Sequence, residues 1–168
     1  MNIFVTSDNP VECARVLDDR RLVKMCLETA QLLSTAVRLA GWSGTEDYRE
    51  LYKATHANHP CARWVRMSDN NFEWTYAHGL ALCREYYDRY HRVHACLKVI
   101  NSCGSYRDVF LTGSLTEFVN CTDIENDDDV FRCYRKYLVA KWTADGDKAK
   151  WTNRKPPEWS MWGVKQND

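Results

Sequence analysis

The sequence predicts a mainly α fold, a single-domain helical bundle with a short N-terminal extended arm and an extended aromatic C-terminal tail. Apolar residues recur at steps of three and four along the longer segments, which is the spacing of one buried helix face. The length of 168 residues, with 45% hydrophobic and 27% charged residues, suits one compact core. We therefore expect residues 1–168 to form a single helical domain.

The N-terminal part of the chain is expected to contain the arm and a long helical segment. "MNIFVTS" (1–7) has the composition of a short strand or an extended arm, and "SDNP" then supplies turn and capping residues. Within residues 11–41, Leu22, Cys26 and Leu33 belong to one apolar face, and the glycines of "GWSG" end the pattern. We expect one long helix or a helical pair here, followed by a short helix in residues 45–55.

The central segment begins with a proline that favours a helix start. Pro60 cannot donate an amide hydrogen bond but fits the first turn of a helix. The pattern after it predicts one very long helix over residues 59–100, or two helices with a break near Gly79. Residues 101–122 carry glycine and serine and are expected to form a loop with short structured pieces.

The C-terminal part is expected to be a helix followed by the tail. The acidic run "TDIENDDD" (122–129) suits the positive N-terminal end of a helix over residues 130–142. "NRKPPEWSMWG" (153–163) is rich in proline and tryptophan and predicts an extended, aromatic segment.

Charge and hydropathy narrow the classes of partner. The 23 basic and 23 acidic residues cancel, so any DNA binding must use a local basic patch. No apolar run is long enough to span a membrane, and the N-terminus lacks the pattern of an export signal. We expect a soluble, cytoplasmic protein without membrane contact, and the sequence does not specify an oligomeric state.

The eight cysteines are scattered through the helical patterns and form no CxxC pair. We interpret them as buried, reduced thiols that take the place of small apolar residues. No metal and no other cofactor is expected. A zinc site assembled from distant cysteines and histidines is the alternative, although the spacings that usually identify one are missing.

A polar stripe runs along the first long helical segment. Arg21, Lys24, Glu28 and Gln31 are spaced by three and four residues and share one face. One interpretation is a solvated charged face. The other is a mixed site, in which Glu28 is the catalytic carboxylate and Arg21, Lys24 and Gln31 contact the substrate.

The stretch "THANHPCARWVRMSDN" (55–70) is unusually dense in polar side chains. Two imidazoles in front of a helix can bind phosphate or move protons, and the arginines after them share a face with an asparagine. We predict catalytic roles for His56 and His59 and substrate contacts for Arg63, Arg66 and Asn70. The alternative is that the histidines cap the helix and that the neighbouring tryptophans belong to the core.

Two further groups of charged residues are candidates. Arg89 follows Glu85 by one helical turn, a spacing that suits either an internal ion pair that contacts substrate or an ordinary helix-stabilising pair. The segment "KWTNRK" (150–155) combines cations with an aromatic ring, as in proteins that hold nucleic-acid backbone and stack on bases. The predicted nucleic-acid-binding residues there are Lys150, Trp151, Arg154 and Lys155, and docking of the tail onto the body is the alternative.

Taken together, "DNPVECARVLDDRRLVKMCLETAQLL", "ATHANHPCARWVRMSDNNFEW", "LALCREYYDRYHRVH" and "KWTNRKPPEW" resemble a family of small, mostly uncharacterised bacteriophage proteins. The chain is also similar to the phage pyrimidine-dimer DNA glycosylases of the endonuclease V type. Those enzymes carry a histidine and, seven residues later, an essential glutamate, and the corresponding pair is Arg21 and Glu28. The resemblance implies that Glu28 stabilises a developing sugar cation or imine. It also implies an attacking N-terminal amine, freed in that family by removal of the initiator methionine, a removal that Asn2 disfavours.

These observations lead to one principal hypothesis for the function. We expect a phage-type enzyme that acts on damaged or modified DNA bases, either excising a base or transferring a group to one, in the cytoplasm of an infected bacterial cell. Chemistry on a base requires that the base leave the stack. The alternatives are a non-catalytic phage protein that binds a host factor and an enzyme that acts on free nucleotides.

Overall fold

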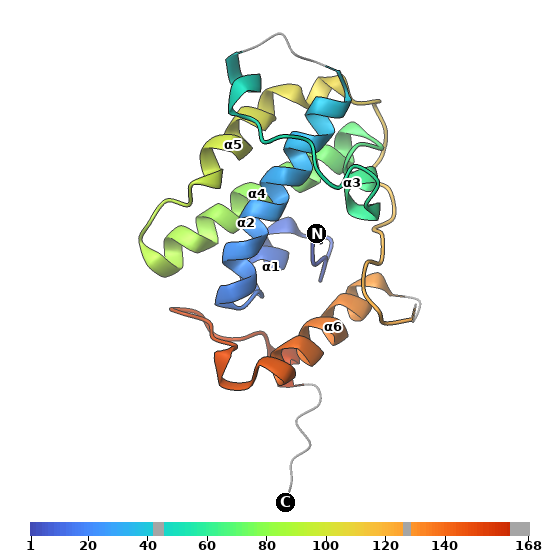
Figure 1. The fold of residues 1–168 in the computed structure, drawn as a ribbon. Helices are drawn as coiled ribbons and strands as arrows, with labels where there is room; N and C mark the ends of the chain where they lie inside the picture. The colour runs from blue at the N-terminus through green and yellow to red at the C-terminus, as the bar shows by residue number, and fades with distance from the viewer. Residues whose placement is uncertain (42–45, 126–128, 162–168) are drawn as a thin grey trace, which may run out of the picture.

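The computed structural model describes residues 1–41, 46–125 and 129–161, and within these ranges helices are the only regular secondary structure. The mainly α class predicted from the sequence is therefore confirmed (Figure 1). The α-helices are α1 (Pro10–Arg15), α2 (Asp19–Leu39), α3 (Pro60–Val65), α4 (Asp69–Tyr90), α5 (Cys96–Cys103) and α6 (Val130–Asp145). Short 3-10 helices are η1 (Glu46–Glu50), η2 (Gly104–Val109), η3 (Gly146–Lys148) and η4 (Glu158–Met161).

The centre of the molecule is formed by α2 and α4, with α1 and α5 packed beside them (Figure 1). Gly79 lies inside α4, where it faces side chains of α2 and α5. A Cβ atom at this position would come within 3.1 Å of the Thr29 side chain and 3.2 Å of the Ile100 side chain. The glycine serves close helix packing, so the break predicted near it is wrong.

The break in the predicted long helix lies earlier in the chain. Helix α3 ends at Val65, and the side chain of Ser68 caps the start of α4 by accepting a hydrogen bond from the Asn71 amide (3.1 Å). Helix α4 then ends at Tyr90, and His91, its C-cap, has a left-handed φ of 52°. A serine N-cap is a common helix start, but the sequence offers several such residues and does not select this one.

The N-terminal residues form an arm rather than a strand. Ile3 and Val5 are fully buried, and the side-chain oxygen of Asn2 accepts hydrogen bonds from the amides of Ile3 (2.7 Å) and Phe4 (3.0 Å). Phe4 adopts a left-handed φ of 43°. The turn fixed by Asn2 sends the chain into the core and leaves its first residues beside α2.

Only part of the predicted 45–55 helix is present, namely η1. The guanidinium group of Arg38 donates hydrogen bonds to the carbonyls of Tyr48, Leu51 and Tyr52, which replaces helical pairing in this segment. Residues 42–45, which include most of the predicted "GWSG" stop, lie outside the described residues, as do 126–128 of the acidic run and 162–163 of the tail.

The C-terminal part packs across one end of the helical body (Figure 1). A long connection from η2 leads to α6, whose Trp142 donates a hydrogen bond to the buried Asp18 carboxylate (2.8 Å). The tail then returns to α2, where the Asp19 amide donates to the Lys150 carbonyl (2.8 Å). Elements from both ends of the chain therefore lie around the start of α2.

All eight cysteines lie in the described part of the chain and are unpaired, as predicted. Seven are buried, and Cys121 is partly exposed. Although the cysteines are scattered along the sequence, four of them gather with a histidine into two compact groups, Cys26 with Cys83 and Cys61 with Cys121. Among the described residues, no helix is both long and apolar enough to cross a membrane.

His78 should make the fold sensitive to acid. It is fully buried against Trp74, its Nδ1 pairs with the Pro10 carbonyl (2.9 Å), and its Nε2 has no partner among the described atoms. Burial lowers the pKa of His78 from 6.5 to about 4. As the pH falls, the unfolded chain is protonated at this histidine before the folded protein is. The contribution of His78 to the free energy of unfolding is therefore fully present above pH 6.5 and is lost as the pH drops toward 4.

At pH 4 we expect the protonation of His78 alone to have lowered the free energy of unfolding by about 3 kcal/mol. His78→Asn retains a donor for the Pro10 carbonyl and removes the titration, so its unfolding free energy should depend less on pH. Urea unfolding at pH 6.5 and pH 4 measures the difference. His91→Asn is the matched control, because His91 is exposed and asparagine tolerates its left-handed backbone. Equal pH dependence in both variants would contradict the prediction.

Candidate active site

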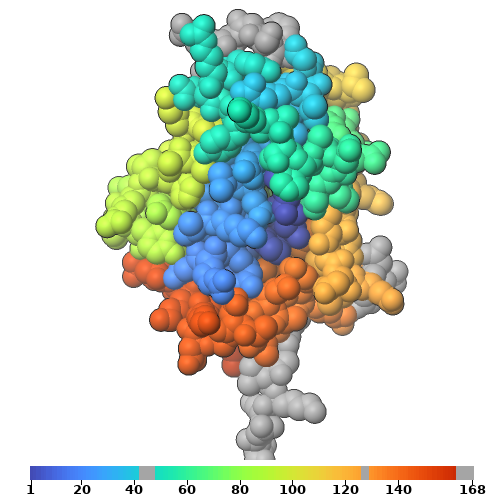
Figure 2. Space-filling model, in the orientation of Figure 1, coloured from blue at the N-terminus to red at the C-terminus, as the bar shows by residue number. Residues whose placement is uncertain are grey.

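A cavity of about 410 Å³ lies between the N-terminal arm, α2 and α6. Figure 2 shows the first residues of the chain, in dark blue, at the surface beside α2 and next to the segments that lead into α6. The cavity is lined by Met1, Asn2, Phe4, Arg20, Arg21, Lys24, Glu28, Cys121, Tyr137 and Lys141. Three residues of the polar stripe on α2 therefore share one cavity with the start of the chain.

Glu28 is the acidic residue of this lining, and it is only 8% exposed. Its Oε2 accepts a hydrogen bond from the Asn2 amide (2.8 Å) and lies 3.7 Å from the α-ammonium nitrogen of Met1. Its Oε1 lies 3.3 Å from the Nζ atom of Lys24. A buried carboxylate in contact with an amine can stabilise a positive charge that develops on a substrate between them.

Cations surround the cavity on the side of α2 and α6. Arg20, Arg21, Lys24 and Lys141 all line it. The Arg20 and Arg21 guanidinium groups contact Asp145 at 2.9 Å and 3.0 Å, and they hold the pKa of that carboxyl group below its usual range. Arg21 also contacts the buried Asp18 carboxylate at 2.9 Å, and the cations around the cavity still outnumber the carboxylates. A local excess of positive charge in a neutral protein can hold a phosphate backbone.

Two aromatic rings form part of the cavity wall. Phe4 stacks on Tyr137 with ring centroids 6.2 Å apart, and the Nζ atom of Lys141 lies 5.0 Å from the centre of the Tyr137 ring. Such a flat surface beside cations can receive a base. The sequence interpretation missed Phe4, Arg20, Tyr137 and Lys141. The four-residue spacing of Tyr137 and Lys141 on α6 was the available signal, but nothing local links α6 to α2.

The two histidines lie near this cavity without lining it, as far as the described residues show. His59 caps α3 through Nδ1, which accepts from the Cys61 amide (3.2 Å), while His56 is exposed and pairs with the Thr55 hydroxyl (2.7 Å). Partial burial, the Met1 α-ammonium group and His56 lower the pKa of His59, and Glu28 acts in the opposite direction. His59 is therefore within electrostatic range of the amine and Glu28.

Of the remaining candidates, Arg66 and Asn70 make hydrogen bonds within the protein. Arg63 is exposed, and Arg66 donates to the Ala62 carbonyl (2.9 Å). Asn70 donates to the Gly113 carbonyl and thereby holds the long connection against α4. Gln31 is partly buried on α2. None of these four belongs to the described lining of the cavity.

Glu85 and Arg89 form the internal ion pair that their spacing suggests, and both are almost fully buried. The Arg89 guanidinium donates to Glu85 (2.8 Å), Asp19 (3.0 Å) and the Arg15 carbonyl (3.1 Å). Arg154 of the tail also donates to both carboxylate oxygens of Glu85. This network fastens the tail to α2 and α4, and it lies apart from the described cavity lining.

The other tail candidates differ in exposure. Trp151 donates to the Val16 carbonyl (2.9 Å) and packs edge-on against Trp142, so its ring is engaged with the body. Lys150 and Lys155 are exposed. The tail thus docks through Trp151 and Arg154 and presents its two lysines to solvent.

The comparison with known families agrees with the geometry of this cavity. A sequence model of the family "pyrimidine dimer DNA glycosylase" matches residues 1–98, more than half of the chain. The chain therefore belongs to the pyrimidine dimer DNA glycosylase family, with a DNA glycosylase-type function and DNA as its substrate. The matched part contains the N-terminal arm, Glu28 and both histidines. No significant match was found among curated proteins or among solved structures.

Proposed function

We propose that this protein excises damaged pyrimidines from DNA, with the amino group at the start of the chain as nucleophile and Glu28 as the catalytic carboxylate. The observation that carries the proposal is the position of Glu28, buried in a basic cavity and 3.7 Å from the α-ammonium nitrogen. Membership of the family supplies the reaction class.

The reaction begins when the amine, having lost a proton, attacks C1′ of the damaged nucleotide. A bond forms between the amine nitrogen and C1′, and the bond between C1′ and the base breaks. The base leaves with the electron pair and takes up a proton. Opening of the sugar ring then gives an iminium ion at C1′. The negative charge of Glu28 stabilises the positive charge that develops on the sugar in both steps.

The rest of the cavity suits the substrate that this chemistry requires. A base must leave the duplex stack before an enzyme can act on its sugar bond. Phe4 and Tyr137 offer a surface on which a displaced base can stack. Arg20, Arg21 and Lys141 are placed to hold the flanking phosphates, which fixes position without reading sequence.

The amine belongs either to Met1 or, after removal of Met1, to Asn2. The backbone nitrogen of Asn2 lies 2.8 Å from Glu28 Oε2, closer than the amine of Met1. Both nitrogens therefore contact the same carboxylate, and the proposed chemistry is the same for either. The mass of a covalent enzyme–DNA adduct distinguishes them.

The test is incubation with duplex DNA that carries cyclobutane pyrimidine dimers, uracil or 5-hydroxymethylpyrimidines, with and without borohydride. We expect cleavage of the glycosidic bond at dimers and a borohydride-trapped adduct through the N-terminal residue. Protein whose amine has been blocked by reductive methylation should cleave few glycosidic bonds and form little adduct. Intact glycosidic bonds in every substrate, assayed by strand cleavage at the resulting abasic site, or an adduct at another residue, would overturn the proposal.

The exposed lysines of the tail should contribute to DNA binding. Lys150→Ala combined with Lys155→Ala is expected to weaken binding to all sequences alike and to reduce the slope of log affinity against log salt by about two. Excision at saturating DNA should be unchanged, because neither lysine belongs to the described cavity lining. Fluorescence anisotropy over a salt series measures both quantities. Lys98→Ala, on α5, is the control and should change neither.

A further inference from the structure

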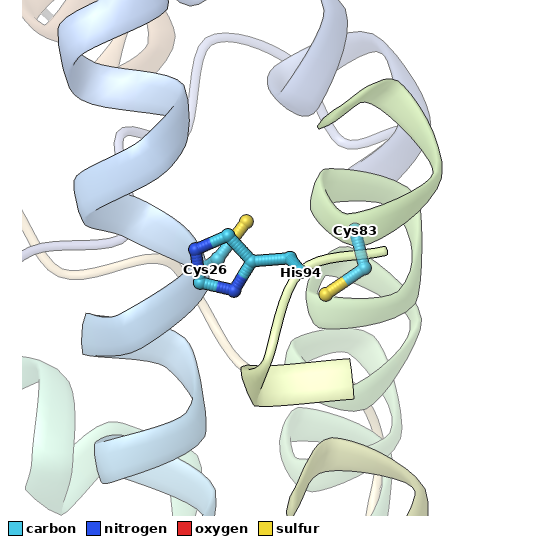
Figure 3. A group of neighbouring side chains, drawn as sticks. All are labelled: Cys26, Cys83 and His94. Atoms are coloured by element: carbon cyan, nitrogen blue, oxygen red, sulfur yellow. The ribbon is translucent and has the colours of Figure 1, made fainter. Parts of the chain in front are cut away.

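A second group of reactive side chains involves the face of α2 that points away from the cavity described above. Cys26 of α2, Cys83 of α4 and His94, which precedes α5, point toward one another (Figure 3). One ligand atom from each lies within 4.8 Å of the others. Cys26 is fully buried, Cys83 is 3% exposed, and His94 is partly buried.

These separations are close to those of a tetrahedral metal centre. Zinc binds thiolate sulfur at about 2.3 Å and imidazole nitrogen at about 2.0 Å, which places tetrahedral ligand atoms roughly 3.5 to 3.8 Å apart. The Cys26 and Cys83 side chains are already in hydrogen-bond contact. An ion at their centre would require only small side-chain movements, because the three ligands come from packed and well-positioned elements.

A candidate fourth ligand lies beside the group, although its sulfur is not among the atoms within 4.8 Å of one another and would have to turn toward them. Cys96, two residues after His94, is 3% exposed and lies within electrostatic range of both Cys26 and Cys83. The Tyr52 hydroxyl lies 3.5 Å from its sulfur and can donate to a metal-bound thiolate, as outer partners of metal ligands commonly do. The Cys96 amide now donates to Nδ1 of His94 (3.2 Å), so the two residues already share one local turn.

The group also has a route to solvent. A hollow of about 300 Å³ is lined by Leu80, Cys83, Arg84, Tyr87, Val93 and Leu97. It reaches the Cys83 side chain from the surface, and the side chains at its rim, including Val93, are well exposed.

We propose that Cys26, Cys83, His94 and Cys96 bind one zinc ion in a structural site that joins α2, α4 and the start of α5. Three thiolates and one imidazole form a donor set typical of closed, structural zinc centres. Cys26 precedes Glu28 by two residues on α2, so the ion would hold in place the helix that carries the proposed catalytic carboxylate. The wide sequence separation of the ligands explains why no zinc-binding spacing is visible in the sequence.

A second trio, His59, Cys61 and Cys121, also has ligand atoms within 4.8 Å of one another. The Cys61 and Cys121 sulfurs lie 3.4 Å apart. Cys121 lines the candidate active site, and the Met1 α-ammonium group acts on all three residues. Positive charge in that position opposes a dication, so we assign the metal to the first group and use the second as the competing location.

The test is the metal content of the full-length protein and its uptake of metal after chelation. Protein purified from zinc-supplemented cells should contain about one zinc per chain by mass spectrometry, and the stripped protein should take up Co²⁺ with the intense absorption of tetrahedral thiolate ligation. Losing an outer partner of a zinc ligand already costs about 10- to 100-fold in affinity. Cys26→Ala and His94→Ala should therefore weaken zinc binding by about 100-fold or more.

Two control variants locate the ion. Cys103→Ala removes a buried cysteine outside both groups, and Cys61→Ala disrupts the second trio; both should keep the metal. His94 is only partly buried, so His94→Ala tests the site even if Cys26→Ala fails to fold, with circular dichroism as the check on folding. Zinc-free protein that also takes up no Co²⁺, or metal that is lost in Cys61→Ala and kept in His94→Ala, would overturn the proposal.

Discussion

Glu28→Gln is expected to lower the rate of base excision by about 100-fold or more, with the fold and most of the DNA affinity retained. Glutamine has nearly the same shape and can still accept the hydrogen bond from the Asn2 amide. It lacks the negative charge that the proposed reaction uses when the sugar becomes cationic. Loss of one electrostatic contact in an enclosed site commonly costs this much turnover. Single-turnover excision of dimer-containing DNA measures it.

The matched control for this variant is Glu50→Gln. Glu50 pairs with Lys98 at 2.9 Å on the surface, and its replacement changes the net charge by the same amount at a distance from the cavity. We expect Glu50→Gln to retain full activity. Binding by both variants should be similar to that of the parent protein. Unchanged excision by Glu28→Gln would remove the catalytic role from Glu28 and leave a protein that binds DNA without using this carboxylate.

The part of this site that belongs to one helix could be predicted from the sequence. Arg21, Lys24 and Glu28 recur at steps of three and four, and the structure places all three in the lining of one cavity. Helical periodicity fixes which side chains share a face, so this inference needed no tertiary information. The choice between a solvated face and a site depended on what covers the helix, and that is not a local property.

The partners of Glu28 could not be derived in the same way. The Met1 amine is 27 positions away in the chain and Tyr137 more than 100, and no local pattern links either to α2. The resemblance to the glycosylases supplied the amine, and the structure supplied α6. For the same reason, the zinc alternative from distant cysteines and histidines could not be assigned to particular residues, because each of the two cysteine–histidine groups draws its members from separate elements.

Helix boundaries show a different limit of sequence reasoning. Gly79 is a weak helix former, and its position in a long segment predicts a break. The close approach of the Thr29 and Ile100 side chains to Gly79 itself favours glycine within the helix and overrides that propensity. By contrast, Pro60 acts through its own backbone geometry, and the predicted helix start there is confirmed.

Arg89→Met is expected to lower the free energy of unfolding by about 3 kcal/mol, the second large effect. Arg89 is 2% exposed and donates to Glu85, Asp19 and the Arg15 carbonyl, so its removal leaves buried acceptors without a donor. Breaking one member of a buried ion network typically costs 3 to 5 kcal/mol. We expect the lower end because Arg154 still contacts Glu85.

Arg84→Met, on the same helix, separates this effect from the loss of an ordinary ion pair. Arg84 and Asp88 have the same four-residue spacing and lie 3.0 Å apart, but the Arg84 side chain is 75% exposed. A surface pair of this kind contributes less than about 1 kcal/mol. Chemical denaturation should therefore show a loss at least about threefold larger for Arg89→Met than for Arg84→Met. Similar losses would mean that the buried network contributes little to holding the tail against α2 and α4, and the docking of the tail would then have to rest on the tryptophan contacts of Trp142 and Trp151.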